Sequence, residues 1–333
     1  MRGYRADMKI GYFLSSEEYR PAELVEQAEL AERAGFDCLW ISDHFHPWND
    51  AQGQSPFVWS VIGAISQVCA LPITTAVTCP IQRIHPAVLA QAAATSAVLT
   101  HGRFTLGLGT GEALNEHVTG GSWPPFDQRW ERLDEAVGLL RQLLTGREVN
   151  HHGRHFTVEN ARLYTVPDQP PAIYLSGFGE KAAVRAGDIG DGYITTKADA
   201  EGLRLFRGRA GGKPAQAGYK VCWAADEKVA VQTAHRLWAS SGLPGELAQI
   251  LPTPQHFEQA STLVTPEATA ASTPCGNDVE RHLSEFGSYL QAGFDEIYIG
   301  QIGGAQPQTS YHEFFRAYHH NLLPQLRQLA AAA

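Results

Sequence analysis

The sequence lacks the features that would place it in a membrane or on nucleic acid. No apolar run approaches the roughly 20 residues that a membrane-spanning helix needs. Lysine and arginine number 26 against 35 aspartates and glutamates, and the basic residues do not cluster. Because neutralising phosphates drives nucleic-acid binding, we expect neither a membrane nor a nucleic-acid partner.

Cysteine is scarce, and the N-terminus carries no recognisable secretion signal. The five cysteines are odd in number, widely scattered and without a Cys-x-x-Cys pair, which argues against structural disulfides and a zinc site. The charged residues 1–7 are followed by an apolar stretch, Ile10 to Leu14, that is too short for a signal peptide. We therefore expect a cytoplasmic protein.

What is present is an alternation of short β-rich apolar runs with longer segments of helical period, which predicts a parallel sheet with crossover helices. The predicted strands are Lys9–Leu14, Cys38–Ser42, Ile73–Thr78, Phe104–Gly109, Ala172–Ser176, Gly192–Thr196, Lys220–Ala224 and Glu296–Gly300. The predicted helices are Pro21–Ala34, Pro56–Cys69, Pro86–Leu99, Asp127–Leu144, Glu180–Gly187, Ala200–Arg207, Glu227–Ser241 and Tyr311–Leu329. Eight such units favour an α/β fold of the (β/α)8 TIM-barrel class over an open doubly wound sheet, which the same alternation also permits.

Two segments interrupt the alternation. Residues 147–168 are polar and suggest a hairpin around His151-His152-Gly153, and residues 242–278 are rich in Pro, Thr and Ala and precede a helix predicted over Val279–Gln291. We interpret both as insertions in one domain spanning 1–333. Long loops of this kind tend to form lids and substrate walls.

The run Ser42-Asp43-His44-Phe45-His46-Pro47-Trp48 directly follows a predicted strand. In a TIM barrel the carboxyl ends of the strands meet at one mouth, where catalytic residues gather. A histidine has a pKa of roughly 6.5, so His44 could take a proton from a hydroxyl group near neutral pH. The alternatives are a histidine bonded to backbone carbonyls beside a core tryptophan, and a metal site on His44 and His46, for which no third ligand is evident.

Glycine-rich turns follow two other predicted strands. These are Gly109-Thr110-Gly111-Glu112 and Ser176-Gly177-Phe178-Gly179. Glycines let a flat or phosphorylated ligand approach the backbone amides closely, although the same residues also occur in ordinary turns. The first run lacks the third glycine of a dinucleotide fingerprint.

Three runs together resemble the luciferase-like hydride transferases that use the deazaflavin coenzyme F420. They are Ser42 to Trp48, Thr75-Ala76-Val77-Thr78-Cys79-Pro80 and Gly109 to Glu116. The resemblance is to the branch of F420-dependent glucose-6-phosphate dehydrogenase and F420-dependent secondary alcohol dehydrogenase, and it runs nearly end to end. It implies a luciferase-like (β/α)8 barrel, usually a homodimer, that acts on a small-molecule substrate.

The resemblance also implies roles for individual residues. His44, Trp48 and Glu112 match the catalytic set around the deazaflavin, with the assignment of base and acid between His44 and Glu112 left open, and no metal is implied. Ala76-Val77 match a non-prolyl cis bulge behind the ring. The residues that match the cofactor-binding positions are Asp43, Ala76, Val77, Thr110, Gly111, Asn115, Ser176, Gly177 and Gly179.

The expected reaction is hydride transfer between an alcohol or carbonyl group and F420. Two alternatives remain: an FMN-dependent monooxygenase or reductase of the same family, and a flavin-binding protein without turnover. The sugar-phosphate enzymes of this branch bind phosphate partly through basic residues in the insertion before the last strand, but this chain has no Lys or Arg between Arg236 and Arg281, and Lys197 is offset from a family phosphate position. We therefore expect an uncharged substrate. Residues that could be apolar walls or ordinary core are Phe57, Trp59, Trp223, Leu251 and Phe257.

Overall fold

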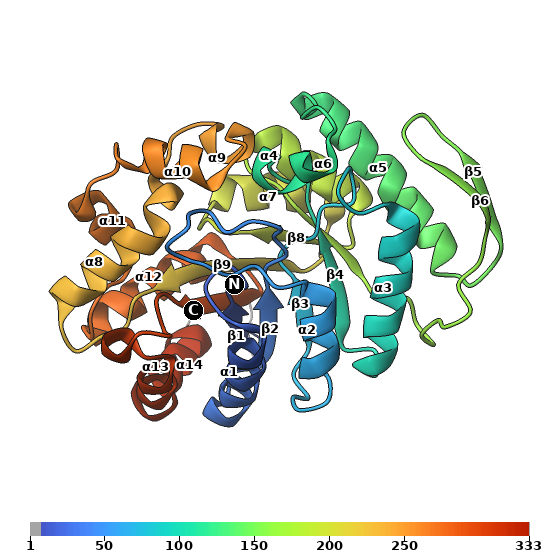
Figure 1. Cartoon of the computed structure of the whole chain (residues 1–333). Helices are drawn as coiled ribbons and strands as arrows, with labels where there is room; N and C mark the ends of the chain where they lie inside the picture. Colours follow the sequence, from blue (N-terminus) through green and yellow to red (C-terminus); the bar gives the residue numbers. More distant parts are fainter. Residues whose placement is uncertain (1–7, 333) are drawn as a thin grey trace.

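A closed barrel of eight parallel strands forms the centre of the computed structural model, which describes residues 8–332 (Figure 1). In chain order the barrel strands are β1 (Lys9–Leu14), β2 (Cys38–Ile41), β3 (Ile73–Thr75), β4 (Phe104–Leu108), β7 (Ile173–Ser176), β8 (Gly192–Thr195), β9 (Ala215–Val221) and β10 (Glu296–Gln301). The last strand pairs with the first, so Lys9 lies beside Glu296 and the barrel closes. The predicted fold class is confirmed. Residues 1–7, on which the expectation about secretion depends, lie outside the described part of the chain.

Helices follow the strands and form the outer layer. They are α1 (Pro21–Ala34), α2 (Val58–Ile65), α3 (Pro86–Leu99), α4 (Ala113–Glu116), α5 (Phe126–Leu143), α6 (Glu180–Ile189), α7 (Ala200–Ala210), α8 (Glu227–Trp238), α12 (Val279–Ala292), α13 (Tyr311–Ala317) and α14 (Leu323–Ala332). The predicted bounds of α1 and α3 are confirmed. Their starts were predictable because each helix has a proline at its first position. The single helix predicted over Tyr311–Leu329 is interrupted by a π-helical turn at Tyr318–Leu322. Within residues 8–332, no helix has the length and apolar character needed to cross a bilayer.

Strand β9 begins earlier than the predicted run Lys220–Ala224. The prediction missed its first residues because Ala215, Gln216, Ala217 and Gly218 carry little β propensity. The barrel interior explains this composition. The rings of Trp40 and Tyr298 stack there with centroids 4.2 Å apart. A Cβ atom on Gly218 would lie 2.4 Å from the Trp40 ring. Gly218 of β9 therefore makes room for two large rings on other strands.

The two insertions differ in place and structure. The first contains the predicted hairpin, β5 (Val149–His152) and β6 (Thr157–Ala161), which lies outside the barrel beyond α5 (Figure 1). The second is helical where the sequence suggested loops: it contains α9 (Leu247–Ile250), α10 (Pro254–Ser261) and α11 (Pro266–Ser272). In Figure 1, α9 and α10 lie along the same edge of the barrel as α4. Only the second insertion therefore lies near the carboxyl ends of the strands.

Candidate active site

The predicted site residues lie after four strands that are consecutive around the barrel, β2, β3, β4 and β7. Asp43, His44 and Trp48 follow β2, and Ala76 and Val77 follow β3. Thr110, Gly111 and Glu112 follow β4, Asn115 lies in α4, and Ser176, Gly177 and Gly179 lie at the end of β7 and before α6. All of them are therefore on one side of the barrel mouth.

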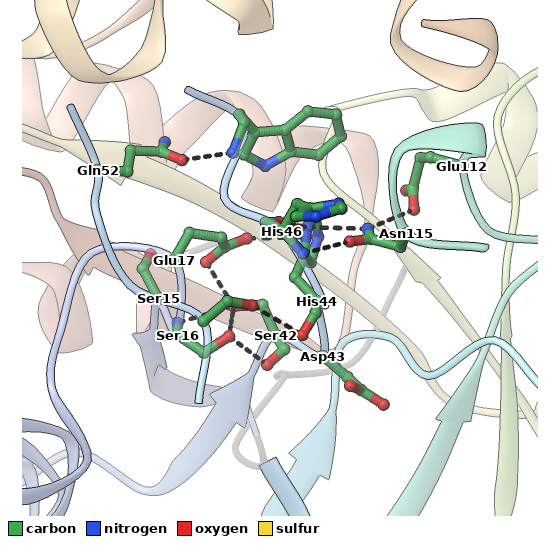
Figure 2. A network of polar contacts seen from close by, with 12 residues as sticks. Ser15, Ser16, Glu17, Ser42, Asp43, His44, His46, Gln52, Glu112 and Asn115 are labelled. Atoms are coloured by element: carbon green, nitrogen blue, oxygen red, sulfur yellow. Dashed lines mark hydrogen bonds and ion pairs between the residues drawn. The ribbon is translucent and has the colours of Figure 1, made fainter. Parts of the chain in front are cut away.

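Asn115 joins the loops after β2 and β4. Its side-chain oxygen accepts hydrogen bonds from the backbone N–H groups of Phe45 (2.8 Å) and His46 (3.1 Å). This fixes the orientation of the amide, so the Nδ2 group faces Nδ1 of His44 at 3.0 Å and a carboxylate oxygen of Glu112 at 3.4 Å. Figure 2 shows the Asn115 side chain between the other two. The two residues predicted to exchange protons are thus connected through one buried amide.

The other ring nitrogen of His44 faces Glu17, which the sequence analysis did not single out. Nε2 lies 3.4 Å from Glu17 Oε1, and the Glu17 side chain is only 2% exposed. The second carboxylate oxygen accepts a 2.7 Å hydrogen bond from Ser42 Oγ (Figure 2). Burial raises the pKa of Glu17, but the charge of His44 in its protonated form, the charge of Lys220 and the Ser42 hydrogen bond outweigh burial, so the pKa of Glu17 lies below the usual value. Glu17 is therefore a carboxylate at neutral pH.

A sequence signal for Glu17 does exist. It follows β1 in the run Ser15-Ser16-Glu17-Glu18, at the same kind of strand end as the predicted residues. The Ser16 hydroxyl donates to the backbone carbonyl of Ser42 at 2.6 Å, which ties the β1 loop to the β2 loop. Extending the strand-end rule to β1 would have found this carboxylate.

Both histidines of the run Ser42 to Trp48, His44 and His46, form hydrogen bonds with other protein groups. With Nδ1 of His44 accepting from Asn115 at 3.0 Å, the hydrogen of the neutral ring lies on Nε2, the nitrogen that is 3.4 Å from Glu17; the contact of Nδ1 with the His46 carbonyl is longer, at 3.3 Å. His46 donates from Nδ1 to the carbonyl oxygen of Leu114 at 3.0 Å. Over residues 8–332, no three His, Cys, Asp or Glu side chains are grouped so that they could hold a metal ion.

Asp43 anchors the loop after β2 to the loop after β3. One of its oxygens accepts from Thr78 Oγ1 (2.7 Å), and the other from Arg83 Nη2 (3.0 Å). Arg83 also donates its backbone N–H to Glu116 at 2.7 Å. Burial raises the pKa of Glu116 to about 7, although Arg83 acts in the opposite direction. Arg83 and Glu116, which were not predicted, thus form a buried network behind the site.

Trp48 and the second insertion form one wall. The Trp48 and His44 rings lie with centroids 5.0 Å apart, and the buried ring of Phe257 in α10 meets Trp48 edge-on, also at 5.0 Å. The backbone N–H of Asp50 donates to Glu258 of the same helix at 3.0 Å. The insertion is therefore fixed directly to the loop that carries His44.

The other predicted apolar residues lie in different environments. Trp59 is buried in the core against Phe104, and Phe57 is exposed at the start of α2. Trp223, after β9, and Leu251, after α9, are half-buried. Of the five candidates, Phe257 has the direct ring contact with a predicted catalytic residue, Trp48.

The floor of the site is made of small groups. Ala76 and Val77 are half-buried between two buried threonines, and the peptide bond joining them is cis, as the family resemblance implies. A Cβ on Gly109 would lie 2.7 Å from Val77, and one on Gly111, which has φ +70°, would lie 2.5 Å from the Cys79 sulfur. The absence of side chains at both glycines lets the turn after β4 lie close to the floor.

The turn before α6 is also built around glycine. A Cβ on Gly177 would lie 2.5 Å from the Ala182 side chain, so glycine lets this turn pack onto the helix. The carbonyl of Gly177 accepts a 2.7 Å hydrogen bond from the Tyr193 hydroxyl. Gly179, at φ +81°, immediately precedes the helix. The first N–H groups of a helix favour anionic ligands, so this end of the site suits a phosphate.

Comparison with known proteins places this geometry in a family. The sequence profile of the luciferase-like monooxygenases matches residues 8–296. The chain belongs to this family. It is 34% identical to the F420-dependent glucose-6-phosphate dehydrogenase of Mycolicibacterium smegmatis, covering 98% of this chain and 100% of that protein. It is also 34% identical to the F420-dependent hydroxymycolic acid dehydrogenase of Mycobacterium tuberculosis, covering 97% and 89%.

A solved structure agrees with the relationship. An F420-dependent secondary alcohol dehydrogenase in complex with an F420–acetone adduct superposes with a TM-score of 0.86. The two chains are 32% identical, and the match covers 96% of this chain and 99% of the other. The fold and family inferred from the strand-end motifs are therefore confirmed.

Proposed function

We propose that this protein is an F420-dependent oxidoreductase that transfers a hydride between a hydroxyl or carbonyl carbon of an uncharged substrate and the deazaflavin ring. The observation that carries the proposal is the series of polar contacts across the mouth beside the cis Ala76–Val77 floor: Asn115 bonds to His44 and to Glu112, and Glu17 faces the other nitrogen of His44. The relatives that this chain matches along nearly its whole length are F420-dependent dehydrogenases.

The residues present fit such a cofactor. The floor has no large side chain, and the glycines after β4 sit where a Cβ would collide with Val77 or Cys79. Ala76, Val77, Thr110 and Gly111 would hold the ring, while Ser176, Gly177 and Gly179 would hold an acidic tail at the start of α6. Asp43 would support this surface through Thr78 and Arg83. When bound, F420 supplies an acceptor for two electrons and a hydrogen.

The chain supplies the proton chemistry. Because Glu17 faces Nε2 of His44, the two side chains act together: His44 takes the proton of the substrate hydroxyl at Nδ1, where it replaces the hydrogen bond from Asn115, and the Glu17 carboxylate stabilises the imidazolium that forms. Glu112, on the other side of Asn115, is placed to serve the cofactor side of the site. Trp48 excludes water above His44 and packs against Phe257.

The charge distribution favours an uncharged substrate. The insertion that contacts Trp48 has carboxylates at Glu246, Glu258 and Glu267 and no Lys or Arg before Arg281. A phosphate dianion there would lose charge-assisted hydrogen bonds worth about 1.5–3 kcal/mol each. We expect secondary alcohols, aldehydes or ketones as substrates, and little activity on glucose 6-phosphate.

Cofactor titration tests the proposal. The purified protein is titrated separately with F420 and with FMN, and turnover of the tighter complex is followed with neutral secondary alcohols and with glucose 6-phosphate. F420 binding and alcohol-dependent bleaching support the proposal. Tight FMN binding without F420 binding would favour the monooxygenase or reductase alternative, and F420 binding without turnover would favour a binding protein.

A homodimer through α2 and α3 is part of the proposal. The two helices pack side by side, and neither contains a charged residue. Their outer side exposes Phe57 (59%) and Val88 (60%), together with Val98 and Leu99. An uncharged, partly apolar helical face of this kind is suited to cover a second copy of itself.

A further inference from the structure

Lys220 lies inside the barrel mouth on β9, where the mechanism above does not use it. Its ammonium nitrogen donates a 2.6 Å hydrogen bond to Ser15 Oγ. The same nitrogen lies 3.7 Å from the centre of the Phe13 ring and 4.0 Å from that of the Trp238 ring. Two aromatic faces and a hydroxyl therefore hold one ammonium group at a fixed position.

The charged groups around Lys220 come from the β1 loop. Burial lowers the pKa of Lys220 below its usual value, although the negative charges of Glu17 and Glu18 act in the opposite direction. Glu18 accepts hydrogen bonds from the backbone N–H of Gly303 (2.6 Å) and from the indole N–H of Trp238. Burial raises the pKa of Glu18 to about 7, so its negative charge is only partly present near neutral pH. Glu17 is therefore the carboxylate whose negative charge Lys220 faces throughout the neutral pH range.

The other charged groups near this cluster have partners or lie behind it. Arg236 lines a cavity of about 40 Å³ together with Glu18. Asp43, next to His44 in the chain, is paired with Arg83. Lys220 is therefore the cation that the β9 wall contributes to the Glu17–His44 pair.

We propose that Lys220 is a positioning residue for the reaction: its fixed positive charge opposes protonation of the Glu17–His44 pair and so keeps that pair able to accept the substrate proton at neutral pH. Removing a positive charge raises the affinity of every nearby group for a proton. In a buried site, a neighbouring charge shifts the titration midpoint of an ionisable group by about one pH unit or more. The kinetic part of this inference rests on the proposed function; the electrostatic part does not.

The electrostatic part is tested without cofactor. The full chain is labelled with [13Cε1]histidine, the His44 signal is assigned by its absence in His44→Asn, and its titration is followed by NMR. We expect the midpoint to rise by about one pH unit in Lys220→Met and Lys220→Gln. Lys220→Arg, which keeps the charge, and Ser15→Ala, which removes only a hydrogen bond, should titrate like the unmodified protein. Coincident midpoints in the neutral variants, or a fall, would overturn the inference.

The kinetic part uses the F420-loaded enzyme. In Lys220→Met the acidic limb of the kcat/KM profile should move to higher pH by the same amount. At pH values on the acidic side of the limb, activity should fall about tenfold, and it should recover at higher pH. A uniform loss at every pH, with the limb unmoved, would mean that Lys220 is only structural. If no alcohol is oxidised by the unmodified enzyme, the proposed function fails, while the NMR titration still decides the role of Lys220.

Discussion

Replacing Glu17 by glutamine removes one charge from the site with almost no change in size. The carboxylate is buried, accepts from Ser42 at 2.7 Å and lies 3.4 Å from Nε2 of His44. A glutamine must use its carbonyl oxygen to accept from Ser42, so its NH2 group faces His44 and can neither accept from Nε2 nor stabilise a positive charge on the ring. A hydrogen bond to a charged group is worth about 1.5–3 kcal/mol, which corresponds to a loss of about 10- to 150-fold in kcat.

The assay follows the absorbance of oxidised F420 at saturating neutral alcohol. For Glu17→Gln we expect kcat to fall by about 10- to 150-fold and the acidic limb to move to lower pH. The Kd for F420 should stay the same, because Glu17 contacts His44 and not the residues proposed to hold F420. Ser42→Ala is the matched control: it keeps the charge of Glu17 and removes the neutral hydroxyl that bonds to Glu17 and to Ser16, so its loss should be smaller, about 1 kcal/mol. An unchanged kcat in Glu17→Gln, or a loss explained by weaker F420 binding, would refute the role assigned to this carboxylate.

Three further predictions concern other parts of the molecule. Asn115→Asp places a carboxylate against Nδ1 of His44, so kcat/KM at pH 7 should fall at least about tenfold and recover as the pH is raised; a pH-independent loss would contradict the hydrogen-bond assignment. Burial lowers the pKa of His282 from 6.5 to about 4, so its contribution to stability is complete above pH 6.5 and about 2 kcal/mol of it is lost by pH 5. Urea unfolding at pH 7 and pH 5 should show this as a difference between two proteins: on going to pH 5, the unmodified protein should lose about 2 kcal/mol relative to His282→Gln, because Glu18 and Glu116, whose raised pKa values act in the opposite direction, titrate in both. Val88→Glu, on the exposed side of α3, should give a monomer by light scattering, with Glu29→Gln on α1 as the control; a dimer in both would place the interface elsewhere.

Sequence periodicity predicted the barrel because burial on both faces of a parallel strand demands short apolar runs, and these alternate regularly with helices. It failed at β9, where a glycine, Gly218, leaves space for the rings of Trp40 and Tyr298. No local pattern carries that information, because the large side chains belong to distant strands. The second insertion was also misjudged, since its three helices are short and their stability depends on packing over the mouth.

The strand-end rule found His44, Glu112 and Asn115 and missed Glu17, which obeys the same rule after β1. Arg83 was beyond its reach, because that residue comes well after β3 and returns to pair with Asp43 and Glu116. Lys220 was read as the beginning of a strand, when it is the next-to-last residue of β9 and therefore near the mouth. A shift of a few residues in a strand boundary thus concealed a charged group from the site.

By itself, the sequence determined the barrel, the family and the set of residues that stand at the strand ends, because strand topology brings every such end to one mouth whatever the detailed packing. Only the tertiary structure decided which of them face one another. Asn115 stands between His44 and Glu112, and Glu17 lies on the other side of His44 with Lys220 held near it by Phe13 and Trp238. Hydrogen bonds and charge interactions depend on separations of a few ångström, and those are set by the closure of the barrel and the packing inside it.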